Sequence, residues 1–290
     1  MFKFVPRQLG WIPDLPDSRD LTIAHSTISA LLNRLPRERT GPPDKIDLRF
    51  GDDGEAFLNE KYCCSGEGFS SALAVIRLVE YFERRSRGVS PNRSVSFLYK
   101  TARNLARASG DEGVGLRTSL RAVKKFGLVD ESYWRDDVAQ HDREPPAFVY
   151  GVASFLPEFD YVRVVPDVQR PSSLDRWATL CDFLAAGFPV VFGFSIPDSI
   201  TECPDIPFRP HFDGFKGGVS AIAVGYNSHR YGRNQAGLLI GTPWGNQWGE
   251  DGFGWLPKAF VDEGLARDFW TIIYHDELDK TEFFCPAAVI

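Results

Sequence analysis

The sequence has little that would mark a membrane, secreted or nucleic-acid-binding protein. Its 290 residues include only five cysteines, an odd number that suits a disulfide framework poorly. No apolar run is long enough to cross a bilayer, and the opening "MFKFVPRQLGWIPDLPD" lacks the apolar core of a secretory signal. The net charge of -6 gives no general attraction to nucleic acid or to anionic membranes. We therefore expect a cytoplasmic protein that binds neither.

Signals for metals and cofactors are equally scarce. The five histidines show no spacing typical of zinc ligands, and no cluster of His, Cys and Asp stands out. The glycine-rich "GDEGVGL", residues 110–116, is a weak phosphate signal when it stands alone. The sequence therefore predicts no metal site and no cofactor.

The residues that are present indicate a globular protein in which helices precede strands. Hydrophobic residues make up 43% of the chain and charged residues 25%, which is ordinary for a globular domain. Residues 1–43 are rich in proline and arginine and are expected to form an arm, and residues 275–290 a tail. Between them, residues 44–150 should be mainly helical and residues 151–274 mainly β, which predicts an α+β fold.

Hydrophobic periodicity places the main elements. A helix is expected from Ser65 onward, with an apolar stripe and with charged residues lying mostly off it. The stripe is Phe69, Leu73, Ile76, Val79 and Phe82, and the charged residues are Arg77, Glu80, Glu83 and Arg84. Further helices are expected in "SVSFLYKTARNLARA", "LRTSLRAVKKFG" and "SSLDRWATLCDFLAAG". Strands are expected in "FPVVFGFSI", "VSAIAVGYN", "GLLIGTPWG", "GFGWLP" and "FWTIIYH".

Several motifs are specific enough to suggest a family. "TPWGNQWGEDGFGWLP", from Thr242 to Pro257, contains two Trp-Gly pairs, and "GGVSAIAVGYN" begins at Gly217. With "PDKIDLR" and "NEKYCCSGEGFSSA", these segments resemble motifs of the papain family of cysteine peptidases, in the family's order. The resemblance covers about residues 10–274. It implies a papain-like two-lobed fold for residues 44–274, with a helical left lobe, a β-barrel-like right lobe and an interlobe cleft.

The same resemblance places the family's catalytic groups on residues that cannot perform their chemistry. The nucleophilic cysteine falls on Gly66, the general-base histidine on Val219, and the asparagine that orients this histidine on Thr242. The glutamine of the oxyanion hole falls on Glu60, whose carboxylate would repel an oxyanion. Without a thiolate and an imidazole, the reaction has neither nucleophile nor base. The resemblance thus implies an inactive homologue, a pseudopeptidase with no catalytic residues.

A pseudopeptidase would work by binding, so the cleft positions become binding candidates for a peptide or protein partner. Besides the four degenerate positions, the candidates are Cys64, Ser65, Glu67, Gly113, Gly115 and Trp244. Gly113 and Gly115 either face a bound peptide or form a tight turn before a helix. If Glu60 and Glu67 both face the cleft, their carboxylates favour a cationic group of the partner.

Two other functions stay open at this point. Cys64 or Ser65 could act as a displaced nucleophile in an enzyme of another kind, although Ser65 is also a good helix N-cap. Alternatively, the cleft is vestigial and the chain is a structural or assembly subunit.

Overall fold

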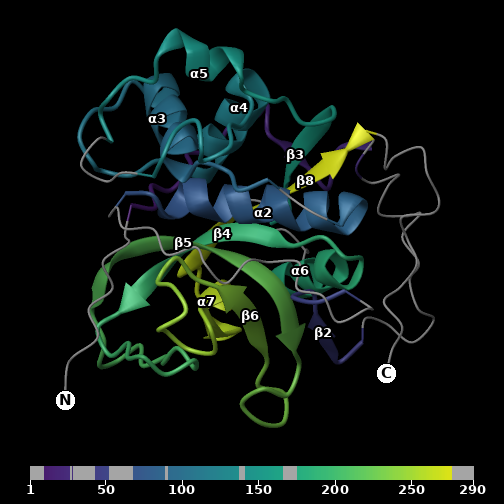
Figure 1. The fold of residues 1–290 in the computed structure, drawn as a ribbon. Coiled ribbons are helices and arrows are strands. Elements are labelled where there is room, and N and C mark those ends of the chain that lie inside the picture. The colour runs from purple at the N-terminus through teal and green to yellow at the C-terminus, as the bar shows by residue number, and fades with distance from the viewer. Residues whose placement is uncertain are drawn as a thin grey trace.

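The computed structural model describes residues 10–26, 28, 43–51, 68–88, 91–136, 141–165 and 175–275. Figure 1 shows the course of the chain through its helices and strands. The helices are α2 (Ser70–Arg87), α3 (Val95–Ala106), α4 (Leu116–Phe126), α5 (Ala147–Gly151), α6 (Arg176–Ala185) and α7 (Ala259–Asp262). The strands are β1 (Leu21–Thr22), β2 (Lys45–Asp47), β3 (Phe159–Arg163), β4 (Val190–Pro197), β5 (Phe215–Asn227), β6 (Gly237–Gly241), β7 (Phe253–Pro257) and β8 (Ala266–Tyr274).

Helices α2, α3, α4 and α6 and strands β4 to β8 confirm the elements predicted from hydrophobic periodicity. Local signals fix several of their ends. Helix α3 begins where the Ser94 hydroxyl accepts a hydrogen bond from the Phe97 N–H, and Asp175 caps α6 in the same way. Helix α2 ends at Gly88, whose φ of 75° is a left-handed conformation that glycine adopts easily.

Helix α2 is the centre of the molecule. It runs between the α3–α5 group on one side and the sheet on the other (Figure 1). Every residue from Ser70 to Glu83 is buried, so three of the charged residues predicted to lie mostly off the apolar stripe are covered, while Arg84 is partly exposed. Their charges are met inside the protein: Glu83 pairs with Arg93 at 2.6 Å, and Glu80 pairs with Arg84 at 3.0 Å.

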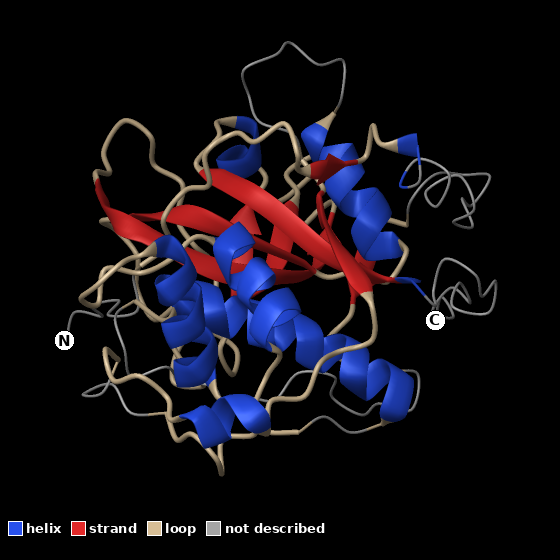
Figure 2. Ribbon diagram, turned by 90° about the horizontal axis from the view of Figure 1, so that it is seen from above, coloured by secondary structure: helices blue, strands red, loops and turns tan. Residues whose placement is uncertain are grey.

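The strands in the described part of the chain form one sheet with the order β1-β3-β8-β4-β5-β6-β7, and β2 pairs with β5. Seen from above, the strands form one twisted layer (Figure 2), with α2 on one side of β4 and β5 and α6 on the other (Figure 1). The sheet is open, so the predicted barrel-like closure is not seen within these ranges. At the β7 end, a loop takes the place of a further strand, because the Trp255 N–H donates to the Pro204 carbonyl and the Ile206 N–H donates to the Trp255 carbonyl.

The N-terminal segment joins this sheet instead of leaving the body. Leu21 and Thr22 form β1, which pairs in parallel with Val162 and Arg163 of β3. The predicted boundaries at residues 43 and 275 and the two-lobed division remain predictions. No helix within the described ranges is long and apolar enough to cross a membrane.

Candidate functional site

The candidate site residues divide into two groups. Val219, Thr242, Trp244, Gly113 and Gly115 belong to the described part of the chain. The others lie outside the described residues: Glu60, Cys64, Ser65, Gly66 and Glu67.

Val219, predicted to stand at the position of the family's base, lies in an apolar wall. It is in β5, directly across from Phe194 of β4, and has no exposed surface. The Phe194 ring contacts Trp244 edge-on at 6.3 Å between ring centroids, and Trp244 meets Trp248 at 4.7 Å. These rings all come from the second half of the chain. A hydrocarbon side chain suits this wall, because no hydrogen bond is required of it.

Thr242, predicted to stand at the position of the orienting asparagine, forms part of a turn. It is fully buried, and both its N–H and its hydroxyl donate to the Gly252 carbonyl, at 2.9 and 3.2 Å. Its own carbonyl accepts a 2.7 Å hydrogen bond from the Arg77 guanidinium of α2. The hydroxyl proton therefore serves the fold locally.

Helix α2 is pressed closely against the strands beside these two residues. The hydroxyls of Ser71 and Ser220 lie 2.8 Å apart, and the Ser220 N–H donates to the Ser70 hydroxyl at 3.3 Å. The crevice between α2 and the β5–β6 strands has no room for a water molecule. This seam offers no chamber for a substrate.

The N-terminal arm lies across the candidate site. The Val114 N–H donates to the Gly10 carbonyl at 3.1 Å, and the Trp11 N–H donates to the Gly218 carbonyl at 3.3 Å. Val114 directly precedes the turn into α4, whereas Gly218 is the β5 neighbour of Val219. Residues 10 and 11 thus connect the helical side of the site to the sheet.

Glycines on the body make room for this arm. A Cβ at Gly193 would lie 2.0 Å from the Trp11 ring, and one at Gly218 would lie 2.6 Å from it. A Cβ at Gly113 would meet the Gly10 carbonyl oxygen at 2.0 Å, and one at Gly115 would meet the Asp14 carboxylate at 2.5 Å. Side chains larger than hydrogen are excluded at these positions as long as the arm is in place.

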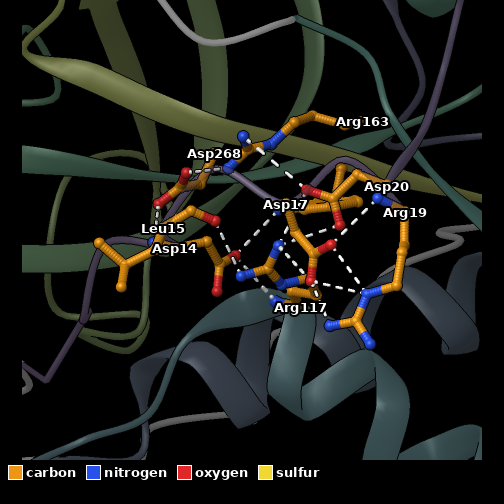
Figure 3. A network of polar contacts seen from close by, with 9 residues as sticks. Asp14, Leu15, Asp17, Arg19, Asp20, Arg117, Arg163 and Asp268 are labelled. Carbon is orange, nitrogen blue, oxygen red and sulfur yellow. Dashed lines mark hydrogen bonds and ion pairs between the residues drawn. The ribbon is translucent and has the colours of Figure 1, made fainter.

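Polar contacts hold the arm on the body, as Figure 3 shows. Asp268 of β8 accepts hydrogen bonds from the Trp11 indole at 3.2 Å and from the Asp14 N–H at 2.8 Å. Arg163 of β3 pairs with the same carboxylate at 2.8 Å. Asp268 has a φ of 56°, an uncommon backbone conformation for a residue other than glycine.

Asp14 supplies the cap that α4 lacks. The N-cap residue of α4 is Gly115, which has no side chain, and the Asp14 carboxylate accepts from the Arg117 N–H at 3.0 Å. The same oxygen accepts from the Trp270 indole at 3.1 Å. Burial, followed by the negative charge of Asp268, raises the pKa of Asp14 to about 6, against the lowering influence of Arg117 and Arg163.

Arg117 completes the contact. Its guanidinium pairs with Asp20 at 2.9 Å and donates to the Leu15 carbonyl at 2.9 Å. One α4 side chain thereby holds two separate points of the arm.

The sequence did not single out Trp11, Asp14, Arg117 or Asp268 as site residues. One signal was present: Gly193 interrupts the apolar run "FPVVFGFSI", and a glycine inside a strand often marks a close approach of another group. Within the described ranges, no group of three or more His, Cys, Asp or Glu side chains could hold a metal ion. Cys181 is buried in α6, and burial raises the pKa of its thiol to about 12, which leaves it unreactive at neutral pH.

Comparison with known proteins gives this architecture a context. No family model matches the sequence. An uncharacterised peptidase C1-like protein of Acanthamoeba polyphaga mimivirus is 27% identical over 283 residues, with 92% of this chain and 87% of the relative covered.

Solved structures match over most of the chain. Xylellain, a cysteine protease from Xylella fastidiosa, superposes with a TM-score of 0.70 at 24% identity, over 93% of this chain and 98% of xylellain. Procathepsin L2 from the larval midgut of Tenebrio molitor gives a TM-score of 0.67 at 19% identity, over 92% of this chain and 77% of its own. The chain therefore has the papain-like fold, with mixed α and β content, and is similar to cysteine peptidases.

Proposed function

We propose that this protein is a catalytically inactive papain-like pseudopeptidase that acts as a peptide- or protein-binding regulatory module. The observation that carries this proposal is the environment of Val219. The position that resembles the family's general base is a fully buried valine opposite Phe194. Peptide hydrolysis by a thiol requires a group that accepts and returns a proton, and a hydrocarbon side chain does neither.

The neighbouring position supports the same proposal. A triad also requires a group that orients the base, and the Thr242 hydroxyl is occupied by the Gly252 carbonyl. Three histidines that could supply an imidazole lie in other parts of the fold, each beside a carboxylate. His141 lies beside Asp142, His229 beside Asp44, and His275 beside Asp160.

We place the binding site between two lobes, one formed by the α3–α5 group and the other by the sheet. The arm segment from Gly10 to Asp14 runs through this space and makes backbone hydrogen bonds with both walls. An extended chain is thus already accommodated there, which favours a peptide or a protein segment as the ligand.

The same segment gives weight to a second function. Since the arm occupies the space that a ligand would need, a structural or assembly subunit with a vestigial cleft is the alternative. The two functions differ in whether a peptide added from outside gains access to the site.

The loss of chemistry is tested with peptide and ester substrates and with papain-directed epoxide and vinyl-sulfone probes, followed by intact mass spectrometry. We expect no cleavage and an unmodified mass, while an active papain-like peptidase treated in parallel becomes labelled. Gly66→Cys alone should not restore turnover, because Val219 still offers no base. A stoichiometric adduct on Cys64 would instead favour the displaced-nucleophile enzyme.

Binding is tested with basic and acidic versions of one fluorescent peptide, titrated against the wild type and a Glu60→Gln/Glu67→Gln double variant. If the two carboxylates face the cleft, the wild type prefers the basic peptide and the double variant loses this preference. Failure of both peptides to bind would favour the structural alternative.

A further inference from the structure

The contact between arm and body contains two carboxylates, of which Asp14 is half-buried and Asp268 is buried. Asp14 of the arm and Asp268 of β8 are joined by a 2.8 Å hydrogen bond from the Asp14 N–H to the Asp268 carboxylate. Asp268 is 5% exposed. Asp268 therefore lies beside the Asp14 backbone, and its negative charge together with burial disfavours the charged form of the Asp14 carboxyl unless cations balance both charges.

Charged groups face Asp14 from every element packed against it. On the body these are Arg117 of α4, Arg163 of β3 and Asp268 of β8, and on the arm itself they are Asp17, Arg19 and Asp20 (Figure 3). The two arginines are shared. Arg163 pairs with Asp268 at 2.8 Å, and Arg117 pairs with Asp20 at 2.9 Å. Asp14 itself accepts from neutral donors, the Trp270 indole and the Arg117 N–H, which leaves its negative charge only partly balanced.

Besides this polar network, little apolar surface anchors residues 10–20 of the arm. The Trp11 ring lies over Gly193 and Gly218, whereas Ile12 is 44% and Leu15 78% exposed. A segment held by one aromatic ring and by polar contacts belongs to the low-stability end of a fold, where local opening costs much less than global unfolding. A change of one charge is enough to shift such an equilibrium.

We infer that residues 10–20 form a latch over the candidate site, which holds tightly in acid and loosens when Asp14 ionises against Asp268. The inference rests on the proposed function only in taking the covered space as the binding site. It gives that site a regulation: a ligand gains access as the pH rises.

The direction follows from proton binding. In the latched state the pKa of Asp14 is raised to about 6, and in the open arm it returns toward its ordinary value of 3.8. Between these values the latched state holds a proton that the open state has lost. Latching is therefore most favourable below the open-state pKa and is weakened as the pH rises through about 6. From these two values, the latching equilibrium constant falls about tenfold between about pH 5 and about pH 8.

Hydrogen exchange of the full-length protein measures this equilibrium without any ligand. Four amides donate hydrogen bonds only when the arm is in place: Trp11, Asp14, Val114 and Arg117. Their protection factors, from which the intrinsic pH dependence of exchange is divided out, should fall about tenfold between about pH 5 and about pH 8. The amide of Ala223, inside β5, serves as the reference and should keep its protection.

Asp14→Asn keeps the shape and an acceptor oxygen but removes the titration, so its protection factors should differ by less than about twofold between the two pH values. The matched control is Asp17→Asn. Hydrogen bonds from Arg19 hold the pKa of Asp17 below its usual range, and this variant should keep the tenfold change. Equal protection in the wild type at both pH values, or a tenfold change that persists in Asp14→Asn, would overturn the latch.

A second measurement keeps the latch testable if the arm of the Asp14→Asn variant fails to dock at any pH. The carboxyl carbon of Asp14 is then titrated in the wild type by carbon-13 NMR. A midpoint near 6 supports the latch, and a midpoint near the ordinary 3.8 overturns it. Because no peptide or substrate is present, failure of the latch is distinguishable from failure of the proposed binding function.

Discussion

At the scale of single residues, Val219 shows how closely the candidate site fits an apolar side chain. It is fully buried, and its strand partner Phe194 packs on Trp244. If residue 219 were a histidine, the resemblance to the family would place its imidazole beside Thr242. The Thr242 hydroxyl, however, already donates to the Gly252 carbonyl. An imidazole placed here would lose its hydrogen bonds to water, and the Thr242 hydroxyl would not replace them.

Val219→His should therefore lower the free energy of unfolding by about 1–3 kcal/mol, the cost of burying a polar group without its hydrogen bond. Chemical denaturation monitored by tryptophan fluorescence measures this change. Val219→Ile adds a similar volume without polar atoms and serves as the control, so the difference between the two variants isolates the polar cost. A histidine variant as stable as the isoleucine variant would mean that the site still accommodates a base.

At the scale of elements, α2 stands out because three of its charged side chains are buried: Arg77, Glu80 and Glu83. Arg93, in the segment before α3, is 6% exposed and pairs with Glu83 of α2 at 2.6 Å. It also donates to the Ser154 hydroxyl at 2.8 Å. This arginine thus links α2 to two other segments of the helical side.

Arg93→Met should destabilise the protein by about 3–5 kcal/mol, because Glu83 would be left buried with its charge uncompensated. Lys124→Met is the matched control, since Lys124 pairs with Asp160 on the surface and this loss should cost less than about 1 kcal/mol. Thermal denaturation at neutral pH compares the two. Equal losses would show that the burial of the Arg93–Glu83 pair carries no special weight.

The elements also show which helices and strands the sequence predicts and which it does not. Apolar periodicity locates α2, α3, α4 and α6 and strands β4 to β8, because each pattern is contained in a short window. Strand β1 has only two residues and depends on a partner about 140 positions away, so no local pattern announces it. Periodicity placed the charged residues of α2 mostly off the apolar stripe, but it does not reveal that a second layer covers most of that face as well.

The same limit applies to the candidate site. Motif spacing singled out Val219 and Thr242 as candidates, whereas the contact of Trp11 and Asp14 with Asp268 spans more than 250 positions of the chain. Tertiary contacts over such separations follow from the fold as a whole. Gly193 in β4 was the local sequence signal of one such contact, because a glycine inside a strand marks a place where another group comes close.

At the scale of the whole molecule, the two ends of the described chain meet over the site. The described part of the arm begins at Gly10. Asp268 of β8, near the other end of the described chain, contacts Asp14 of this arm (Figure 3). Most of the core is one cluster that includes residues of α2, α3, α4 and the sheet, and it also contains Ile28, with Leu21 and Ile23 packed against it. Residues 10–20 contribute no side chain to this cluster, so they should separate from the body without unfolding it.

Gly193→Ala tests this separation. Its Cβ would lie 2.0 Å from the Trp11 ring, whereas the extended backbone of β4 accepts alanine. Overpacking of this kind costs about 1–3 kcal/mol, and an arm held mainly by polar contacts should yield before the sheet does. We expect the protection factors of the Trp11 and Asp14 amides to fall by about tenfold or more, with little change in the thermal midpoint of the body. Gly218→Ala, at 2.6 Å from the ring, should have a smaller effect, and Gly151→Ala, which meets nothing within 4 Å, should have none. A body that unfolds together with the arm in Gly193→Ala would show that the arm is part of the cooperative core.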